Sequence, residues 1–258
     1  MVKGLYTAYT GMINEQNRMD IMTNNLANAS TVGYKKEGST SQSFDDVLTV
    51  KIKDQSVGMR NVQRLGVKNP GVKIGENYTD YSQGSFRITG NTYDLALSGE
   101  GFFAIEFTNK AGETDTKYTR AGQFTLNKDG YLVTEEGDYV LDTQNRRIRL
   151  NTLIDSSITD DGTIYQNGQA VAKIQVTDFE DYDYLEKYGE TYYQPIQGAK
   201  TIAAKAQVKS GYLEMANVQI VSEMVNLISI TRAYESNQKV VQTIDDTLDV
   251  AVNQIGRV

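Results

Sequence analysis

The chain has 258 residues, of which 39% are hydrophobic, which is enough for one large domain or two smaller ones. It contains no cysteine and no histidine, so thiol nucleophiles, disulfides, the commonest zinc ligands and the usual neutral-pH general base are excluded. The formal net charge is −7 without a basic block, which argues against nucleic acid as a partner, and no run of about 18 apolar residues predicts insertion into a membrane.

Residues 4–28 have the apolar spacing of a helix. Four apolar side chains recur every seven residues, namely Leu5, Met12, Met19 and Leu26. This period places them along one side of a helix. The pattern fades after Asn28, and Gly33 is suited to end the helix. We therefore predict an amphipathic helix close to the N-terminus.

Residues 31–75 show no sustained period. Several glycines and the sequence Asn69-Pro70-Gly71 indicate loops. Residues 50–53 alternate between apolar and charged side chains, as an exposed strand does. We predict an extended connector for this range.

Residues 76–212 change to a period of two, which is typical of strands. Asp129-Gly130 and Asp161-Gly162 lie between such segments and predict hairpins, because aspartate followed by glycine favours tight turns. Many short strands with closely spaced turn signals predict an antiparallel β-rich domain.

Residues 213–258 return to the seven-residue spacing seen near the N-terminus. The apolar positions are Leu213, Ile220, Leu227, Tyr234, Val241 and Leu248. No proline or glycine interrupts residues 213–255, so the pattern predicts a helix of about 60 Å, too long for the core of one compact domain. We predict an α+β fold in which long N- and C-terminal helices pair in a coiled-coil-like manner and carry an inserted antiparallel β-rich domain. The alternative is that each helix faces the core of the β-rich domain.

The sequence offers no evident catalytic or metal centre. The two hairpin sequences superficially resemble calcium loops, but neither supplies the alternating ligands and the final glutamate that such a loop needs. Gly99-Glu100-Gly101 is followed by two phenylalanines and not by a helix, which argues against phosphate binding. Adjacent acids such as Glu135 and Glu136 are typical of solvated surface. We predict no catalytic, cofactor-binding or metal-binding residue and no enzymatic activity.

Several stretches of the chain resemble the signatures of one protein family. They are residues 24–35, 94–103, 118–124, 211–218, 223–228 and 232–239. With them the chain resembles the bacterial flagellar hook-basal-body axial proteins, the rod proteins among them. The signature positions are Asn24, Asn25, Leu26, Ala27, Asn28, Gly33, Tyr34, Asp94, Gly99, Gly101, Phe102 and Phe103. Within the family, length and C-terminal sequence are most similar to the distal rod member, and the proximal rod member is the alternative.

The resemblance implies a structural subunit of the flagellar basal-body rod. Such subunits polymerise into a hollow helical drive shaft that transmits torque from motor to hook and serves as an export channel. The family pattern assigns residues 1–30 and 213–258 to a helical inner polymerisation domain, residues 31–75 to a connector, and residues 76–212 to a β-rich outer domain. The ten apolar heptad positions of the two helices would then form the polymerisation interface.

The resemblance also implies partners and a location. The expected partners are further copies of the chain, other rod and hook axial proteins, ring bushing proteins around the rod, and the flagellar type III export apparatus, with no nucleic acid and no membrane insertion. The expected location is the basal body, crossing the periplasm and cell wall. Export without a cleaved signal is expected because the N-terminus lacks a basic region followed by an apolar one. The alternatives are a non-flagellar surface fibre or adhesin and a carbohydrate-active enzyme on a β scaffold.

Overall fold

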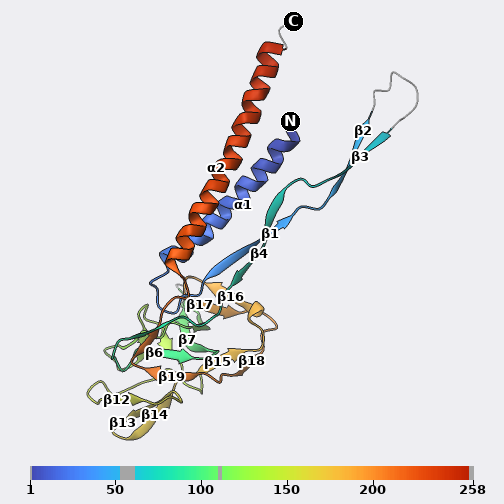
Figure 1. Cartoon of the computed structure of the whole chain (residues 1–258). Helices are drawn as coiled ribbons and strands as arrows, with labels where there is room; N and C mark the ends of the chain where they lie inside the picture. Colours follow the sequence, from blue (N-terminus) through green and yellow to red (C-terminus); the bar gives the residue numbers. More distant parts are fainter. Residues whose placement is uncertain (1, 53–61, 110–111, 256–258) are drawn as a thin grey trace. The chain divides into compact units, whose positions relative to one another are not determined.

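The computed structural model describes residues 2–52, 62–109 and 112–255, and the chain divides into two compact units. Unit 1 contains Met1–Leu26, Glu37–Asp80 and Ile220–Val258, and unit 2 contains Ala27–Lys36 and Tyr81–Gln219. The chain has a helix near each end and an antiparallel β-rich body between them (Figure 1). This arrangement confirms the predicted α+β class.

Both long helices belong to unit 1. They are α1 (Val2–Ala27) and α2 (Ile220–Val250), and a short π-helical stretch (Ala251–Ile255) follows α2. The N-terminal helix closely matches its predicted range, because its apolar period persists until the turn in which the Thr31 N–H donates to the Asn28 carbonyl.

The prediction that the C-terminal helix begins at Leu213 is wrong. Leu213 lies in β20 (Tyr212–Glu214), which pairs antiparallel with β5 (Phe86–Ile88) in unit 2. Its side chain is buried there. One apolar residue at the end of a seven-residue series fits a buried strand as well as a helix, so the spacing alone could not place the helix start.

Helices α1 and α2 lie side by side in unit 1 and run in opposite directions (Figure 1). A Cβ atom added to Gly4 would lie 3.6 Å from the Ile244 Cδ1 atom, and one added to Gly11 would lie 3.0 Å from the Asn237 Nδ2 atom. Ala8, between these glycines on the same side of α1, is also buried. The two glycines leave room for the Ile244 and Asn237 side chains of α2.

Four strands between Glu37 and Thr79 form antiparallel pairs in unit 1. Strand β1 (Glu37–Ser43) pairs with β4 (Val72–Thr79), and β2 (Val47–Ile52) pairs with β3 (Val62–Lys68). We call these four strands the ribbon. It covers most of the predicted connector, whose residues 53–61 lie outside the described residues.

The ribbon differs from the predicted extended connector because its pairing does not depend on an apolar pattern. Strand β1 reads EGSTSQS, without a single large apolar side chain. Helix α1 holds this strand through polar contacts instead: the Asn14 Nδ2 atom donates to the Ser41 hydroxyl at 3.1 Å, and the Asn25 side chain both donates to the Glu37 carbonyl and accepts from the Glu37 N–H. Hydrophobic periodicity carries no signal for such a strand.

Unit 2 is built around a nine-stranded antiparallel sheet (Figure 1). Its central strand is β7 (Phe102–Thr108), which pairs with β8 (Thr114–Thr119), β11 (Tyr139–Val140) and β15 (Val176–Phe179). The sheet also contains β9 (Phe124–Leu126), β10 (Leu132–Thr134), β16 (Leu185–Tyr188), β17 (Tyr192–Pro195) and β18 (Thr201–Ala203), with a 3-10 helix η1 (Tyr182–Tyr184) before β16. A three-stranded sheet of β12 (Ser156–Ile158), β13 (Thr163–Gln166) and β14 (Gln169–Lys173) and a pair of β6 (Leu95–Ser98) with β19 (Gln207–Ser210) complete the strands of unit 2 among the described residues.

Two neighbouring aromatic residues of β7 pack in two different hydrophobic clusters of unit 2. Phe103 packs with Leu95 and Phe124 in one hydrophobic cluster, whereas Phe102 packs with Phe179 and other aromatic residues in a second cluster. Both side chains are fully buried. Successive side chains of a strand point to opposite faces, so the Phe102-Phe103 pair supplies both cores from one strand.

The predicted hairpin turns are present at both positions. The Asn127 side chain accepts hydrogen bonds from the N–H groups of Asp129 and Tyr131, and Gly130 has a φ of +82°. Gly162, with a φ of +79°, lies in the turn between β12 and β13. These contacts support turns with no need for a bound ion.

Candidate assembly surface

The predicted heptad residues are only partly covered in unit 1. Leu5, Met12, Met19 and Leu26 of α1 and Leu227, Tyr234, Val241 and Leu248 of α2 are half-buried, while Ile220 is exposed. The residues of α2 that contact α1, Asn237 and Ile244, lie three positions after Tyr234 and Val241. Ile230, another seven residues earlier, is buried. The series that faces α1 is therefore offset by three residues from the predicted one.

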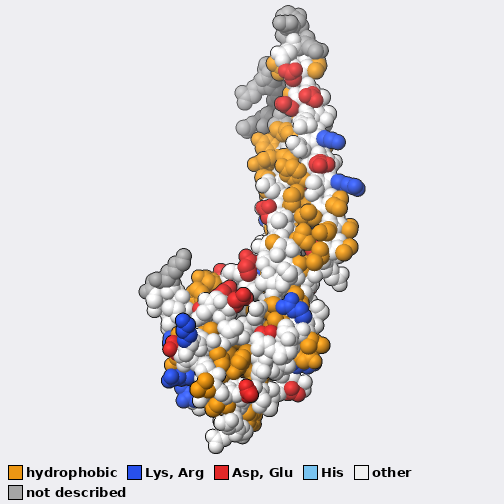
Figure 2. Space-filling model, turned by 90° about the vertical axis from the view of Figure 1, so that its left-hand side faces the viewer, with side chains coloured by type: hydrophobic (Ala, Val, Ile, Leu, Met, Phe, Trp, Pro, Cys, Tyr) orange, Lys and Arg blue, Asp and Glu red, His pale blue; other side chains and the backbone are white. Residues whose placement is uncertain are grey.

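A second apolar surface lies on α2 and is open to solvent. Val221, Met224, Val225 and Ile228 are 77%, 47%, 61% and 52% exposed. Their spacing of three, four and seven residues places them on one side of the helix, and we call them the α2 apolar face. Figure 2 shows hydrophobic side chains gathered along the helical part of unit 1.

The α2 apolar face ends where charged residues begin. Arg232, Glu235 and Lys239 continue the same side of the helix and are exposed. Contiguous exposed apolar side chains with a polar border are typical of a surface that binds another protein. The first two turns of α2 are therefore the part of this helix best suited to an intermolecular contact.

Helix α1 and the ribbon add further exposed apolar side chains to unit 1. Tyr6, Tyr9 and Ile13 share one side of α1 and are 62%, 53% and 41% exposed. Tyr6 also lines a cavity of about 250 Å³ together with Val47 and Pro70 and two polar residues of the ribbon. Unit 1 thus presents apolar side chains from both helices and from the ribbon.

The family-type signature residues of unit 1 hold the structure together. Asn25 is fully buried and bonds to the Glu37 backbone at 2.7 and 2.9 Å. Leu26 is half-buried at the end of α1, Asn24 is exposed, and Ala27, the first residue of unit 2, is exposed as well. Asn25 therefore anchors the end of α1 to the first strand of the ribbon.

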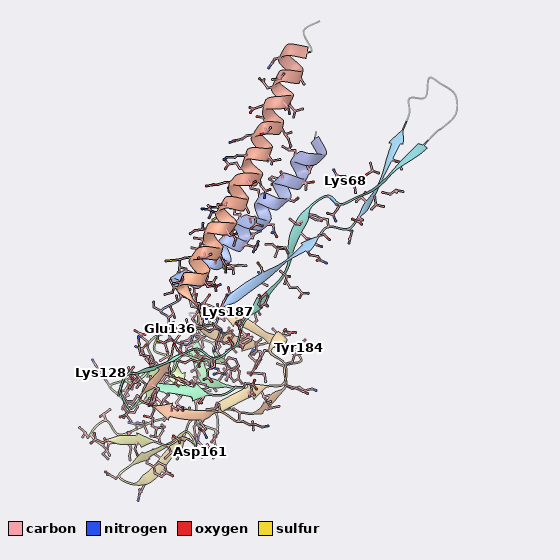
Figure 3. The ribbon with its side chains drawn as sticks, viewed as in Figure 1. Lys68, Lys128, Glu136, Asp161, Tyr184 and Lys187 are labelled. Carbon is pink, nitrogen blue, oxygen red and sulfur yellow. The ribbon has the colours of Figure 1, made fainter. Side chains whose placement is uncertain are left out.

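The signature residues of unit 2 are also structural. Tyr34 is fully buried beneath the Lys187 amine, which lies 4.2 Å from the centre of its ring (Figure 3). Asn28 donates to the Glu190 carboxylate at 2.8 Å, and the Asp94 carbonyl accepts from the Gly211 N–H at 2.8 Å.

The signature glycines allow close backbone packing. Gly33, Gly99 and Gly101 all have positive φ values, of +70°, +116° and +134°. A Cβ atom on Gly101 would lie 2.9 Å from the Ala204 Cβ atom, and one on Gly99 would lie 3.2 Å from the Ala206 Cα atom. These glycines permit close backbone contacts, and Phe102 and Phe103 fill the two hydrophobic cores. These signature residues of unit 2 therefore have structural roles.

One cavity in unit 2 is lined by the adjacent acids that the sequence suggested as solvated surface. It has a volume of about 460 Å³, and the adjacent acids Glu135 and Glu136 lie exposed in its lining (Figure 3). The neighbouring Tyr192 hydroxyl donates to Asp138 at 2.8 Å, and burial raises the pKa of both Tyr192 and Asp138. Among the described residues, no group of three or more acidic side chains is placed to hold a metal ion.

Small residues were the signal for the helix contact that hydrophobic spacing missed. Gly4, Ala8 and Gly11 follow each other at four and three residues, which places them on one side of α1.

Of the described helices, none is long and apolar enough to cross a membrane.

Three protein-family models match this chain, one near each end and one in the β-rich body. A model described as "Flagella basal body rod protein" matches residues 5–35, one described as "Flagellar hook protein FlgE/F/G D1 domain" matches residues 96–168, and one described as "Flagellar basal body rod FlgEFG protein C-terminal" matches residues 209–255. The flagellar basal-body rod protein FlgG of Bacillus subtilis is 34% identical, with 98% of this chain and 99% of the relative covered. The FlgG protein of Caulobacter vibrioides is 34% identical over 96% of this chain and 97% of the relative, and the FlgF protein of the same species is 32% identical over 100% of both.

Proposed function

The chain belongs to the family of bacterial flagellar basal-body rod proteins and is a structural subunit of the rod, and we propose that its copies assemble through the helical surface of unit 1. The observation that carries this proposal is the exposed α2 apolar face. A valine, isoleucine or methionine side chain contributes about 1.5–3 kcal/mol when it moves from water into an apolar contact. Burying Val221, Met224, Val225 and Ile228 against a neighbouring copy would therefore strongly favour assembly.

Within one subunit, we propose that α1 and α2 pair in a coiled-coil-like manner. The contacts of Gly4 with Ile244 and of Gly11 with Asn237 support this pairing. From one contact to the next, α1 advances by seven residues and the antiparallel α2 goes back by seven. The half-buried heptad positions would then border the pair and be covered by neighbouring subunits. Leu213 is not part of this interface, because it is buried in the β20 strand of unit 2.

At the level of the polymer, we propose the hollow drive shaft that the family pattern implies. Helices α1 and α2 would then form its inner layer, and the β-rich unit 2 its outer layer. The shaft would cross the periplasm inside ring bushing proteins, transmit torque to the hook and pass exported subunits through its centre. Export of this chain by the type III apparatus belongs to the same proposal.

The position along the rod is proposed as distal, with proximal as the alternative. Relatives named FlgG and FlgF are both similar over nearly the whole chain. Self-assembly and contact with other rod and hook components follow from the family in either case.

The test of the assembly surface is a charge placed on the α2 apolar face. Val225→Asp should abolish rod formation and motility, because burying an unpaired carboxylate costs several kcal/mol. Ser222→Asp is the matched control, since Ser222 is exposed in the same turn of α2 but lies outside the apolar face. Rods of normal length in the Val225→Asp strain would refute the proposed surface.

A further inference from the structure

The chain passes between unit 1 and unit 2 at four places, after Leu26, Lys36, Asp80 and Gln219. Force carried along the backbone of one subunit from one unit to the other therefore passes through these four crossings. Lys36, Ser82 and Asn217 of unit 2 each lie within two residues of a crossing. These residues make hydrogen bonds next to three of the four crossings.

Glu214 is the shared acceptor of this region. Its carboxylate accepts from the Lys35 amine at 2.7 Å, from the Gly84 N–H at 3.0 Å and from the Arg120 guanidinium at 3.3 Å. Its main-chain carbonyl accepts from the Gly33 N–H at 2.8 Å. One residue thus connects three parts of unit 2. They are the Ala27–Lys36 segment, the beginning of the Tyr81–Gln219 segment and the end of that same segment.

Asn217 adds a second set of bonds three residues later. Its side-chain oxygen accepts from the Lys36 N–H at 2.8 Å, and its Nδ2 atom donates to the Ser82 hydroxyl at 3.0 Å. The Lys35 amine also donates to the Ser82 carbonyl at 2.7 Å. The same three segments are therefore bonded again, now at the residues closest to the crossings.

The burial of this cluster argues for a geometric role. Lys35, Arg120 and Glu214 are 1%, 3% and 0% exposed, so two cations share one carboxylate away from water. Removing charges from water is costly, and a buried ion cluster often stabilises a fold no more than apolar residues of similar volume would. Directional bonds from one carboxylate to Lys35, Gly84 and Arg120, however, cannot be supplied by apolar side chains.

We propose that Glu214 and Asn217 are positioning residues that fix the places at which three of the chain crossings leave unit 2. Their bearing on torque rests on the proposed function as a rod subunit. The geometry itself is a property of the single subunit and does not depend on assembly. Failure of the positioning proposal and failure of rod assembly are therefore measured separately.

The test measures a distance within unit 2 of the full-length monomer. The chain has no cysteine, so spin labels can be placed at Ser30→Cys and Gln219→Cys, both exposed positions. Pulsed electron spin resonance then gives the distribution of the distance between the Ala27–Lys36 segment and the segment that ends at Gln219. We expect a narrow distribution in the parent protein and one about twofold broader when Asn217→Ala is added, because the local bonds are lost without unfolding the unit.

A second variant removes the buried charges together. Lys35→Met, Arg120→Met and Glu214→Leu combined removes all three ions of the cluster, so none of the three is left without the others and unit 2 should still fold. The distance distribution should broaden as it does in Asn217→Ala. Asn127→Ala is the matched control, because Asn127 also makes side-chain bonds to backbone N–H groups, but in the turn between β9 and β10. It should leave the distribution unchanged. An unchanged width in Asn217→Ala, or in the folded triple variant, would overturn the proposal.

Discussion

Gly33 occupies a position in unit 2 where a side chain is excluded for two separate reasons. Its φ is +70°, and a Cβ atom there would overlap the backbone of Arg120 and Ala121. Gly189 has almost the same φ, +69°, but no atom within 4 Å of an added Cβ. Substitution of Gly189 therefore tests the effect of the positive φ alone, whereas substitution of Gly33 tests the positive φ and the close contact together.

We predict that Gly33→Ala destabilises unit 2 much more than Gly189→Ala does. The left-handed conformation alone costs alanine about 1–2 kcal/mol, and forced displacement of neighbouring atoms adds about 1–3 kcal/mol. Urea unfolding followed by circular dichroism measures both free energies of unfolding. Equal losses in the two variants would show that the contact with Arg120 and Ala121 is unimportant.

Glu106 and Arg147 form a two-point ion pair in the β-rich body. The Arg147 Nε and Nη2 atoms donate to the two Glu106 oxygens at 3.0 and 2.5 Å. The hydrogen bond from Arg147 lowers the pKa of Glu106, and burial opposes this shift in part. Because the pKa is lower in the folded state, the pair stabilises the fold above the ordinary pKa of 4.5, and this contribution is lost as the pH falls through the lowered pKa.

We therefore predict that Glu106→Gln weakens the dependence of stability on acidic pH. At neutral pH the loss should be at most about 1 kcal/mol, because the pair is partly exposed. Melting temperatures recorded from neutral pH down to about pH 3 should fall less steeply in the variant than in the parent protein. Glu186→Gln, at an exposed position of β16, is the control, and identical pH profiles for Glu106→Gln and the parent protein would contradict the prediction.

At the scale of elements, the sequence predicts those whose stability comes from hydrophobic burial. Helix α1 and the hairpin turns at Gly130 and Gly162 were found because an apolar period or an aspartate-glycine pair marks them. Within the ribbon, the alternation at residues 50–53 indicates β2, whereas β1 leaves no such signal because it is polar and is held by backbone pairing and by Asn14 and Asn25 of α1. Amide side chains that bond to a backbone distant in sequence leave no periodic trace.

In the candidate assembly surface, too, apolar contacts can be predicted from the sequence and polar contacts cannot. Seven-residue spacing predicts a helix in the C-terminal region, and α2 is present there, but the predicted interface positions do not include Asn237 and Ile244, which lie next to α1. A polar residue and two glycines form part of that contact, and neither type contributes to an apolar stripe. The α2 apolar face was not singled out because its four residues span only two turns of the helix.

The helices themselves are expected to depend on assembly. Helices α1 and α2 contain 26 and 31 residues, and much of their apolar surface is exposed in one subunit. Helical stability in proteins comes mainly from packing of the apolar side. We predict that the circular dichroism signal at 222 nm in the dilute monomer is weaker than these helices would give, and that it increases on rod formation. A monomer with the full helical signal would exclude folding coupled to assembly.

The whole molecule combines a β-rich unit that has its own buried cores with a helical unit that exposes apolar side chains. Phe102 and Phe103 supply the two cores of unit 2 within a single subunit. The α2 apolar face of unit 1 has no such cover among the described residues of one subunit. The central claim is that neighbouring subunits of the rod supply this cover.

Thiol accessibility measures that claim most directly. Because the chain has no native cysteine, Val225→Cys introduces a single thiol on the α2 apolar face, and Lys128→Cys introduces one at the exposed turn between β9 and β10 (Figure 3). Maleimide should label both thiols readily in the monomer. In isolated rods, we predict that Cys at position 128 is still labelled whereas labelling at position 225 becomes at least about tenfold slower, as expected for a buried site. Equal labelling of position 225 in monomers and in rods would contradict the account.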